Sequence, residues 1–155
     1  MNYEEWLNTL PSEITDDTLW QMDVYRQALF LGELAWHDVC KLAQDRKTLN
    51  LSAQLYEAVG RISTSLAEGY SRSSEQDQAR FYEYALGAAR ETRDWYYKGR
   101  HVLGERVAWH RVRLTIHLIR QLLTMIPAQR GHEIAEELAP YEVYSLESLL
   151  RAAPM

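Results

Sequence analysis

The chain has 155 residues, of which 46% are hydrophobic and 25% charged, so it can form one domain whose core needs no disulfide or structural metal. Its single cysteine, Cys40, excludes an internal disulfide, which is typical of a reducing compartment. No stretch approaches the roughly 18 uninterrupted apolar residues of a membrane span, and the first residues lack the pattern of a secretory leader. We therefore expect a cytoplasmic protein with no membrane partner.

The net charge of −5 is distributed unevenly along the chain. Residues 1–45 hold 2 Lys and Arg against 9 Asp and Glu, residues 46–130 hold 14 against 8, and residues 131–155 hold 1 against 5. A basic middle is thus flanked by two acidic ends. The pattern indicates either ordinary variation of surface charge or a basic face that acidic neighbours shield.

Residues 1–15 predict a short amphipathic segment and linker, with Trp6 and Leu10 on its apolar side and Pro11 ending its helical part. The first long helix is expected to follow directly. Asp16 or Asp17 is a candidate N-cap for it, because a carboxylate there accepts from free backbone N–H groups and complements the helix dipole.

This first long helix, to about residue 43, carries two apolar strips side by side. The first is a heptad-like seam of Met22, Tyr25, Leu29, Gly32, Trp36, Val39 and Ala43, and the second comprises Ala28, Leu31, Ala35 and Leu42. A helix that is apolar on two faces is either central in the fold or meets another subunit.

Two more helices follow after a polar break. The second repeats apolar residues from Leu51 to Gly69, where the glycine suits a left-handed residue at the helix end. Ser73 or Ser74 resembles the start of a capping box for the third helix, which Gly104 closes.

Small residues and two carboxylates mark the stretch in which the second helix ends and the third begins. We interpret them as positions of helix packing and of the helix corner: Glu68, Gly69, Ala85, Gly87, Ala88 and Glu91. The small residues would let the two helices approach closely. The carboxylates could work as an acid or base, but a structural role is favoured, with Arg61, Arg72 or Arg90 as partner.

The fourth helix, from Glu105 to about Ile126 before Pro127, has an apolar face and a cationic face. The cationic strip comprises Arg106, His110, Arg113, His117 and Arg120. Such a strip could follow a phosphate backbone. It could equally be the solvated back of an amphipathic helix, or pair with the acidic first helix in the same or a neighbouring subunit.

These elements predict an all-α fold without strands. We expect an antiparallel up-down four-helix bundle over residues 16–127, preceded by the short N-terminal segment. Residues 128–155 would form an acidic tail with a possible short helix at 146–152.

The sequence contains no signature of a catalytic or cofactor site. It has no Glu-x-x-His pair of a di-iron bundle and no glycine-rich phosphate loop. Glu33 and His37 could share a helix face, and a surface ion pair is the favoured interpretation. We expect no catalytic residue, cofactor, metal or small-molecule substrate.

Four stretches carry a family resemblance: Leu19–Ala28, Ser52–Leu55, Ser65–Arg72 and Arg80–Thr92. As a set they resemble the bacterial 23S rRNA intervening-sequence proteins, a four-helix-bundle family that includes the accessory variability determinant proteins of diversity-generating retroelements. The resemblance covers roughly residues 19–126. It implies a ring-shaped homopentamer, and the retroelement members engage nucleic acid and a reverse transcriptase through a positively charged barrel.

Two functions are therefore expected. The first is a non-enzymatic homo-oligomeric scaffold, pentameric by resemblance, that binds RNA, DNA or a reverse transcriptase through the cationic strip. The alternative is a protein–protein interaction module without nucleic-acid binding, which docks through the acidic tail and the amphipathic N-terminal segment.

Overall fold

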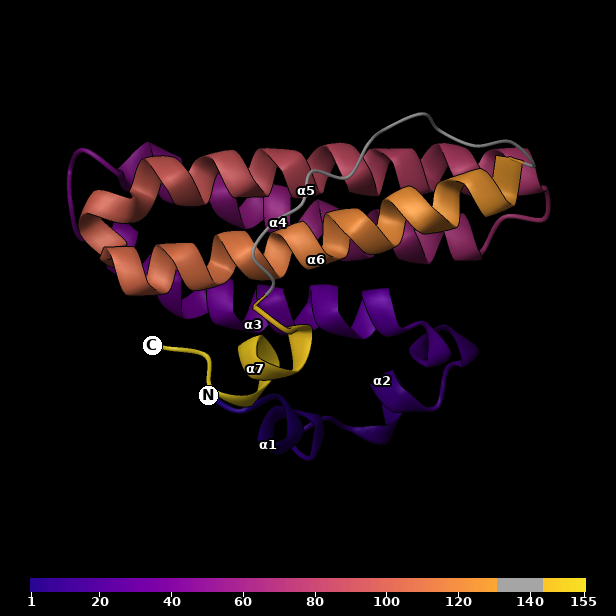
Figure 1. The fold of residues 1–155 in the computed structure, drawn as a ribbon, viewed down its shortest axis with the longest axis horizontal. Coiled ribbons are helices and arrows are strands. Elements are labelled where there is room, and N and C mark those ends of the chain that lie inside the picture. Colours follow the sequence, from indigo (N-terminus) through magenta and orange to yellow (C-terminus); the bar gives the residue numbers. More distant parts are fainter. Residues whose placement is uncertain (131–143) are drawn as a thin grey trace.

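The computed structural model describes residues 1–130 and 144–155, and all regular elements in this part of the chain are helical (Figure 1). Its long helices are α3 (Asp23–Leu42), α4 (Leu49–Tyr70), α5 (Glu75–Leu103) and α6 (Glu105–Arg130). Its short elements are α1 (Tyr3–Leu7), α2 (Ser12–Thr15), the 3₁₀ turn η1 (Thr18–Gln21) and α7 (Leu146–Arg151). The prediction of an all-α fold with four long helices is confirmed.

The long helices pack in chain order, and α3 also contacts α5 and α6. Figure 1 shows them side by side, with α1 and α7 together below α3. Buried apolar side chains from all of them form the core, for example Leu31, Ile62, Ala89 and Leu118. The N-terminal segment belongs to the same core, because buried Trp6 packs against Phe30 of α3 with ring centroids 5.3 Å apart.

The first long helix begins later than predicted. Asp17 caps η1, where its Oδ1 accepts from the backbone N–H of Leu19 at 2.8 Å. Met22 then has an extended backbone conformation, and α3 starts at Asp23. The prediction that Asp16 or Asp17 caps the long helix was wrong because a separate turn, which places Trp20 in the core, comes between them.

The two apolar strips of α3 have different surroundings. The strip of Ala28, Leu31, Ala35 and Leu42 is fully buried between the long helices. The heptad-like seam lies farther out, and Trp36 at its centre keeps 54% of its surface exposed. The narrower strip therefore forms the core of the chain.

Gly69 allows α4 and α5 to touch, and it does not end the helix. It lies inside α4, where a β-carbon would come within 2.7 Å of Cε1 of buried Tyr82. The predicted left-handed cap at Gly69 was wrong, because Ser71 ends α4 in a right-handed conformation. Ser74 caps α5 as expected, with its Oγ accepting from the N–H of Asp77 at 3.1 Å.

The other corner residues separate into buried and exposed positions. Ala85 and Ala88 are buried against the neighbouring helices, whereas Gly87 is exposed and a β-carbon there would meet nothing within 4 Å. Gly87 therefore takes no part in the close contact, because it points to the outer face of α5. Glu68 is exposed as well.

Glu91 has a structural environment on the surface of α5. It forms an ion pair with Arg61 of α4, and its Oε1 accepts from Nε1 of Trp95 at 3.2 Å. The carboxylate thus links two neighbouring helices, as the structural interpretation of this residue expected.

The C-terminal part differs from the prediction at one boundary. Pro127 does not end the fourth helix, since α6 continues to Arg130. A proline removes one backbone donor, and the residues after it can keep the helical path. The short helix α7 lies where a last helix was expected, whereas residues 131–143 of the predicted acidic tail lie outside the described residues.

Among the helices described, none combines the length and apolarity needed to span a membrane.

Candidate nucleic-acid interface

The start of α6 is fixed by the glycine that precedes it. Gly104 has φ of +87°, a backbone conformation that a residue with a β-carbon adopts only with strain. Its N–H donates to the carbonyl of Arg100, which ends α5 before the chain turns into α6. This tight turn places Arg106 in the first turn of α6, exposed at one end of the molecule.

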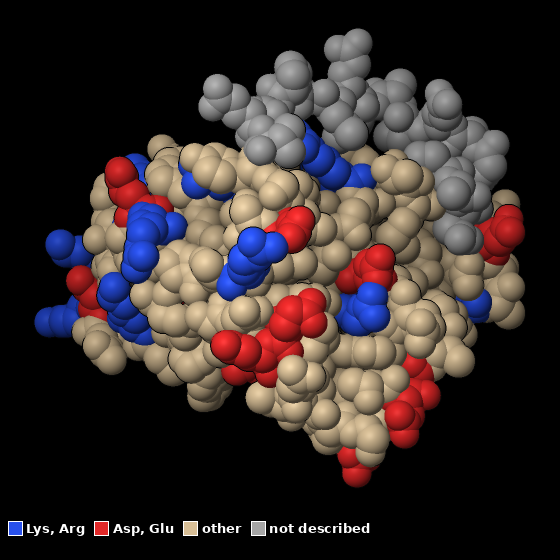
Figure 2. Space-filling view, turned by 60° about the horizontal axis from the view of Figure 1, so that its bottom comes forward, with Lys and Arg blue, Asp and Glu red and all other residues tan. Residues whose placement is uncertain are grey.

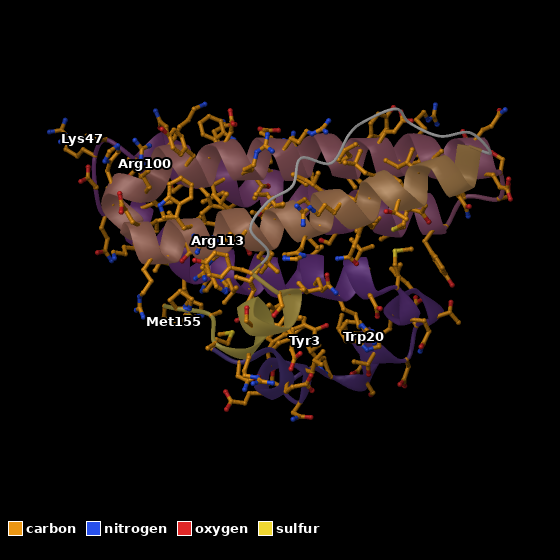
Figure 3. All side chains as sticks on the ribbon, in the orientation of Figure 1. Tyr3, Trp20, Lys47, Arg100, Arg113 and Met155 are labelled. Carbon is orange, nitrogen blue, oxygen red and sulfur yellow. The ribbon has the colours of Figure 1, made fainter. Side chains whose placement is uncertain are left out.

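The predicted cationic strip of α6 is not one exposed surface. His110 is buried, and Arg113 lies under the ring of Tyr144 with its guanidinium carbon 3.8 Å from the ring centroid. His117 donates from Nε2 to the carbonyl of Tyr144 at 2.9 Å. Arg106 is exposed and Arg120 is half-buried. The expectation of five cations on one open face was wrong, because residues 144–155 fold back along α6, as Figure 3 shows near Arg113.

This C-terminal segment is anchored by buried side chains and by the chain's first residue. Leu149 and Ala153 are both buried. The amino group of Met1 donates to the carbonyl of Ala153 at 3.0 Å, and the N–H of Ala153 donates to the carbonyl of Met1 at 3.1 Å. The first residue and the C-terminal segment are therefore joined (Figure 1).

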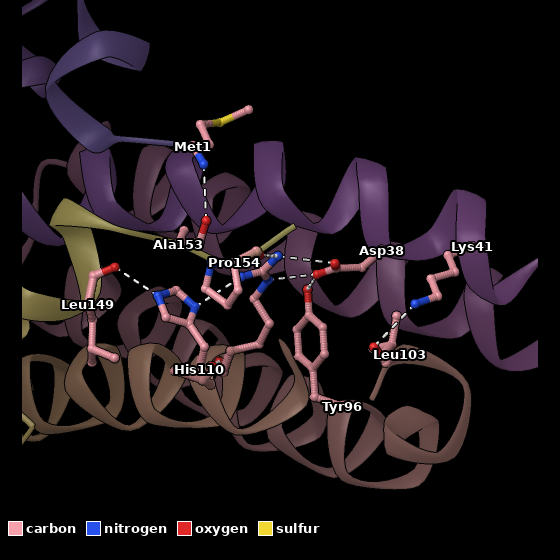
Figure 4. Close-up of polar contacts among 11 residues, drawn as sticks. Met1, Asp38, Lys41, Tyr96, Leu103, His110, Leu149, Ala153 and Pro154 are labelled. Atoms are coloured by element: carbon pink, nitrogen blue, oxygen red, sulfur yellow. Dashed lines mark hydrogen bonds and ion pairs between the residues drawn. The ribbon is translucent and has the colours of Figure 1, made fainter. Parts of the chain in front are cut away.

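A buried ion pair, which was not predicted from the sequence, lies under the segment. Arg111 of α6 is fully buried and donates from Nε and Nη2 to the two carboxylate oxygens of Asp38 on α3, at 2.7 and 3.1 Å. The hydroxyl of Tyr96 on α5 donates to Asp38 at 3.0 Å. Arg111 also donates to the carbonyl of Pro154 at 2.8 Å (Figure 4). One network thus joins three long helices to the C-terminal segment.

His110 extends this network as a neutral imidazole. Its Nε2 lies 2.7 Å from the carbonyl of Leu149, and its Nδ1 lies 2.9 Å from Nη1 of Arg111. Since a carbonyl only accepts and a guanidinium only donates, Nε2 carries the proton. Burial lowers the pKa of His110 to about 4, and the neighbouring Arg111 acts in the same direction. His110 is therefore uncharged at neutral pH and adds no positive charge to α6.

The network is structural in character. Burial, followed by the charge of Asp38, raises the pKa of Tyr96 well above its ordinary value, so the phenol remains a donor. The sequence holds a signal for it, because Asp38 and Arg111 each interrupt an otherwise apolar strip, between Ala35 and Leu42 on α3 and before Leu114 on α6. Two opposite charges on buried strips indicate a buried pair.

Exposed and half-buried cations gather at the end of the molecule where Arg106 lies. They come from the end of α3, from the loop between α3 and α4, and from the turn between α5 and α6: Lys41, Arg46, Lys47, Arg100 and Arg106, which we call the basic end. Figure 3 shows Lys47 and Arg100 at this end. Lys41 links two of the elements, because its Nζ donates to the carbonyl of Leu103 at 3.4 Å.

Most cations of the basic end are free to bind an anion. Within the described part of the chain, no ion pair joins Arg46, Lys47 or Arg106 to a carboxylate. Arg100 stacks on half-exposed Tyr97, with its guanidinium carbon 4.0 Å from the ring centroid. The basic end therefore combines cations with an aromatic ring, one face of which Arg100 covers.

Acidic side chains lie mainly elsewhere on the same face. Figure 2 shows blue side chains at its left end, where the basic end lies, with some red ones among them, and mostly red ones over the lower part, where the N-terminal helices come forward. The acidic N-terminal region thus does not cover the basic end.

No metal site is found in the described residues, where no three His, Cys, Asp or Glu side chains come together. Glu33 and His37 are 4.0 Å apart on α3, and both side chains remain accessible to solvent, as in a surface pair.

The comparisons with known proteins identify the family. The model of the 23S rRNA-intervening sequence proteins matches residues 21–103. The chain belongs to this family. The matched residues span α3, α4 and α5, so the helix α6 and the C-terminal segment lie beyond the match. No curated protein matches the chain, and no solved structure does.

Proposed function

We propose that this member of the 23S rRNA-intervening sequence protein family is a non-enzymatic, cytoplasmic helical scaffold that binds nucleic acid through the basic end. Its fold in this proposal is an antiparallel up-down four-helix bundle. The observation that carries the proposal is the group of exposed cations Arg46, Lys47 and Arg106, which have no carboxylate partner among the described residues. A polyanion gains most from cations that have no such partner to leave.

The chemistry of the basic end favours nucleic acid over a small anion. Its cations come from three separate chain segments and so form an extended surface, which suits a run of phosphates better than a single one. Arg100 lies over the ring of Tyr97, and an unpaired base could stack on this guanidinium or take its place on the ring. Acidic regions elsewhere would repel the same ligand and orient it towards this end.

Titration with RNA at several salt concentrations tests this function. The variant R46Q/K47Q/R106Q removes the three exposed cations. We expect its affinity for a single-stranded RNA to fall at least about tenfold at low salt, and the slope of log K against log salt to become less negative by about 2. Fluorescence anisotropy with a labelled oligonucleotide measures both quantities.

The matched control removes the same charge elsewhere. R61Q/R80Q/R151Q changes three exposed cations that each pair with a carboxylate on the same helix. We expect it to bind RNA nearly as the wild type does. Equal losses in the two triple variants would mean that only net charge matters, and absence of binding by the wild type at low salt would end the proposal.

We further propose that the scaffold is a homo-oligomer. The family resemblance implies a pentamer. The outer seam of α3 supports this, because exposed Trp36 packs edge-on against exposed Tyr56 of α4 with ring centroids 5.9 Å apart. Both rings border a groove that is also lined by Gly32 and Gly60. Light scattering during size-exclusion chromatography gives the mass, and W36S/Y56S should lower it to that of a monomer.

The accessory proteins of retroelements, which the resemblance includes, suggest a reverse transcriptase as a second partner. A scaffold that binds RNA and a reverse transcriptase together would use the basic end for the RNA. The alternative, a pure interaction module that docks through its two acidic ends, is less well supported, because α1 and α7 are already packed within the chain.

A further inference from the structure

Two side chains of α6, an arginine and a histidine, lie on the path that leads from the basic end along the helix. Arg113 follows Arg106 by seven residues, which is two helical turns, so both project from nearly the same side about 10 Å apart. His117 comes one turn later. If both were open, they would lengthen the basic surface along α6.

A single residue, Tyr144, contacts both of these side chains. Its ring covers the guanidinium of Arg113 at 3.8 Å, and its carbonyl accepts from Nε2 of His117 at 2.9 Å. These are the two kinds of group that a single-stranded nucleic acid presents, a flat π face for stacking on arginine and an oxygen acceptor. Tyr144 therefore satisfies these two side chains in the same way that a nucleotide would.

The C-terminal segment is bound by buried contacts at Leu149 and Ala153 and by more exposed contacts at Tyr144. Leu149 and Ala153 are buried, and the carbonyls of Leu149 and Pro154 are bound by His110 and Arg111. Tyr144, in contrast, keeps 51% of its surface exposed and is not part of the buried core. A departure of Tyr144 from α6 would therefore leave the buried contacts of α7 intact.

We propose that Tyr144 is an intramolecular cover, which single-stranded RNA displaces to reach Arg113 and His117. This inference rests on the proposed function, since it extends the surface of the basic end. The base of an incoming nucleotide takes the place of the tyrosine ring, and an oxygen of the same strand takes the place of its carbonyl. The cover lowers the affinity of the resting protein and restricts it to ligands that can supply both groups.

The variant Y144A tests the cover, with Y84A as the matched control because Tyr84 of α5 is exposed to a similar degree. We expect Y144A to bind a single-stranded RNA about three- to tenfold more tightly, with a salt slope steeper by about 1, while Y84A leaves both unchanged. In Y144A/R113Q the gain should disappear. Fluorescence anisotropy against salt measures all four proteins.

A second measurement reports the cover without RNA. Modification by an arginine-selective dicarbonyl reagent, located by mass spectrometry of peptides, should be slow at Arg113 in the wild type and several-fold faster in Y144A. Reactivity at Arg106, which is already exposed, should stay the same.

The two measurements separate the possible failures. Unchanged reactivity of Arg113 in Y144A would contradict the proposal that Tyr144 covers this arginine. Raised reactivity without tighter RNA binding would contradict the proposal that RNA displaces the cover. A gain in affinity that survives R113Q also overturns it. RNA binding that is absent from the wild type and from Y144A alike contradicts the proposed function, and the reactivity of Arg113 still shows whether Tyr144 covers it.

Discussion

The contact between α4 and α5 and the contact between α3 and α6 bring helices together by different means. In the first, Gly69 of α4 is small enough for the ring of Tyr82 from α5 to lie against the helix. In the second, Asp38 and Arg111 meet as a buried, doubly hydrogen-bonded ion pair. The first contact is specified by volume and the second by charge and hydrogen-bond geometry.

The difference decides how each contact tolerates change. A tight apolar contact fails when atoms are added, because surrounding side chains must leave their rotamers. A buried ion pair fails when one member is removed, because the other charge is left without a partner in a medium of low polarity. Three changes separate these two behaviours.

The largest effect is expected from the ion pair. Arg111→Ala should lower the free energy of unfolding by about 3–5 kcal/mol, because the carboxylate of Asp38 loses both of its arginine bonds while it stays buried. Urea denaturation followed by circular dichroism measures the change. The loss should reach the C-terminal segment as well, since Arg111 also holds the carbonyl of Pro154.

The double variant D38L/R111M serves as the control for charge. It replaces the pair by apolar side chains, so no unpaired charge remains, and we expect it to be more stable than either single variant. A double variant as unstable as the sum of the single ones would contradict the assignment of the cost to an unpaired buried charge.

The next effect comes from the small-residue contact. Gly69→Ala should destabilise the protein by about 1–3 kcal/mol, because the added methyl group would lie 2.7 Å from the buried ring of Tyr82. Gly87→Ala is the matched control, since it makes the same substitution in the exposed face of α5, where nothing lies within 4 Å. It should be neutral or slightly stabilising, because alanine favours the helix by about 1 kcal/mol. Similar denaturation midpoints for both variants would argue against the close contact.

The sequence predicted the first contact better than the second for a physical reason. Small residues within a helix are informative by themselves, so the close approach at Gly69 could be expected, although the role of Gly87 could not. The partner of a buried charge is decided by tertiary packing. Asp38 and Arg111 are 73 positions apart, and only the relative rotation of α3 and α6 brings them together.

The candidate site shows the same limit. The spacing on α6 correctly gives the residues of one helix face, but it contains no information about a distant segment that lies on that face. The side chain of Tyr144 covers Arg113, and His110 becomes part of the core, through contacts between residues far apart in the sequence. The basic end was also missed, because its cations come from three chain segments that are adjacent only in the fold.

The smallest of the three effects concerns pH, and it tests whether His110 belongs to the ion-pair network. The pKa of His110 is about 4 in the native state against about 6.5 in the unfolded chain, so between these values the unfolded state binds the extra proton. Stability should therefore fall as the pH decreases from 7, by about 1–2 kcal/mol at pH 5, and this contribution should level off below pH 4. His110→Gln keeps hydrogen-bonding capacity without this titration, so its stability should depend less on pH over the same interval. Because other groups titrate equally in both proteins, the difference between their unfolding curves isolates His110, and parallel curves would place this imidazole outside the network.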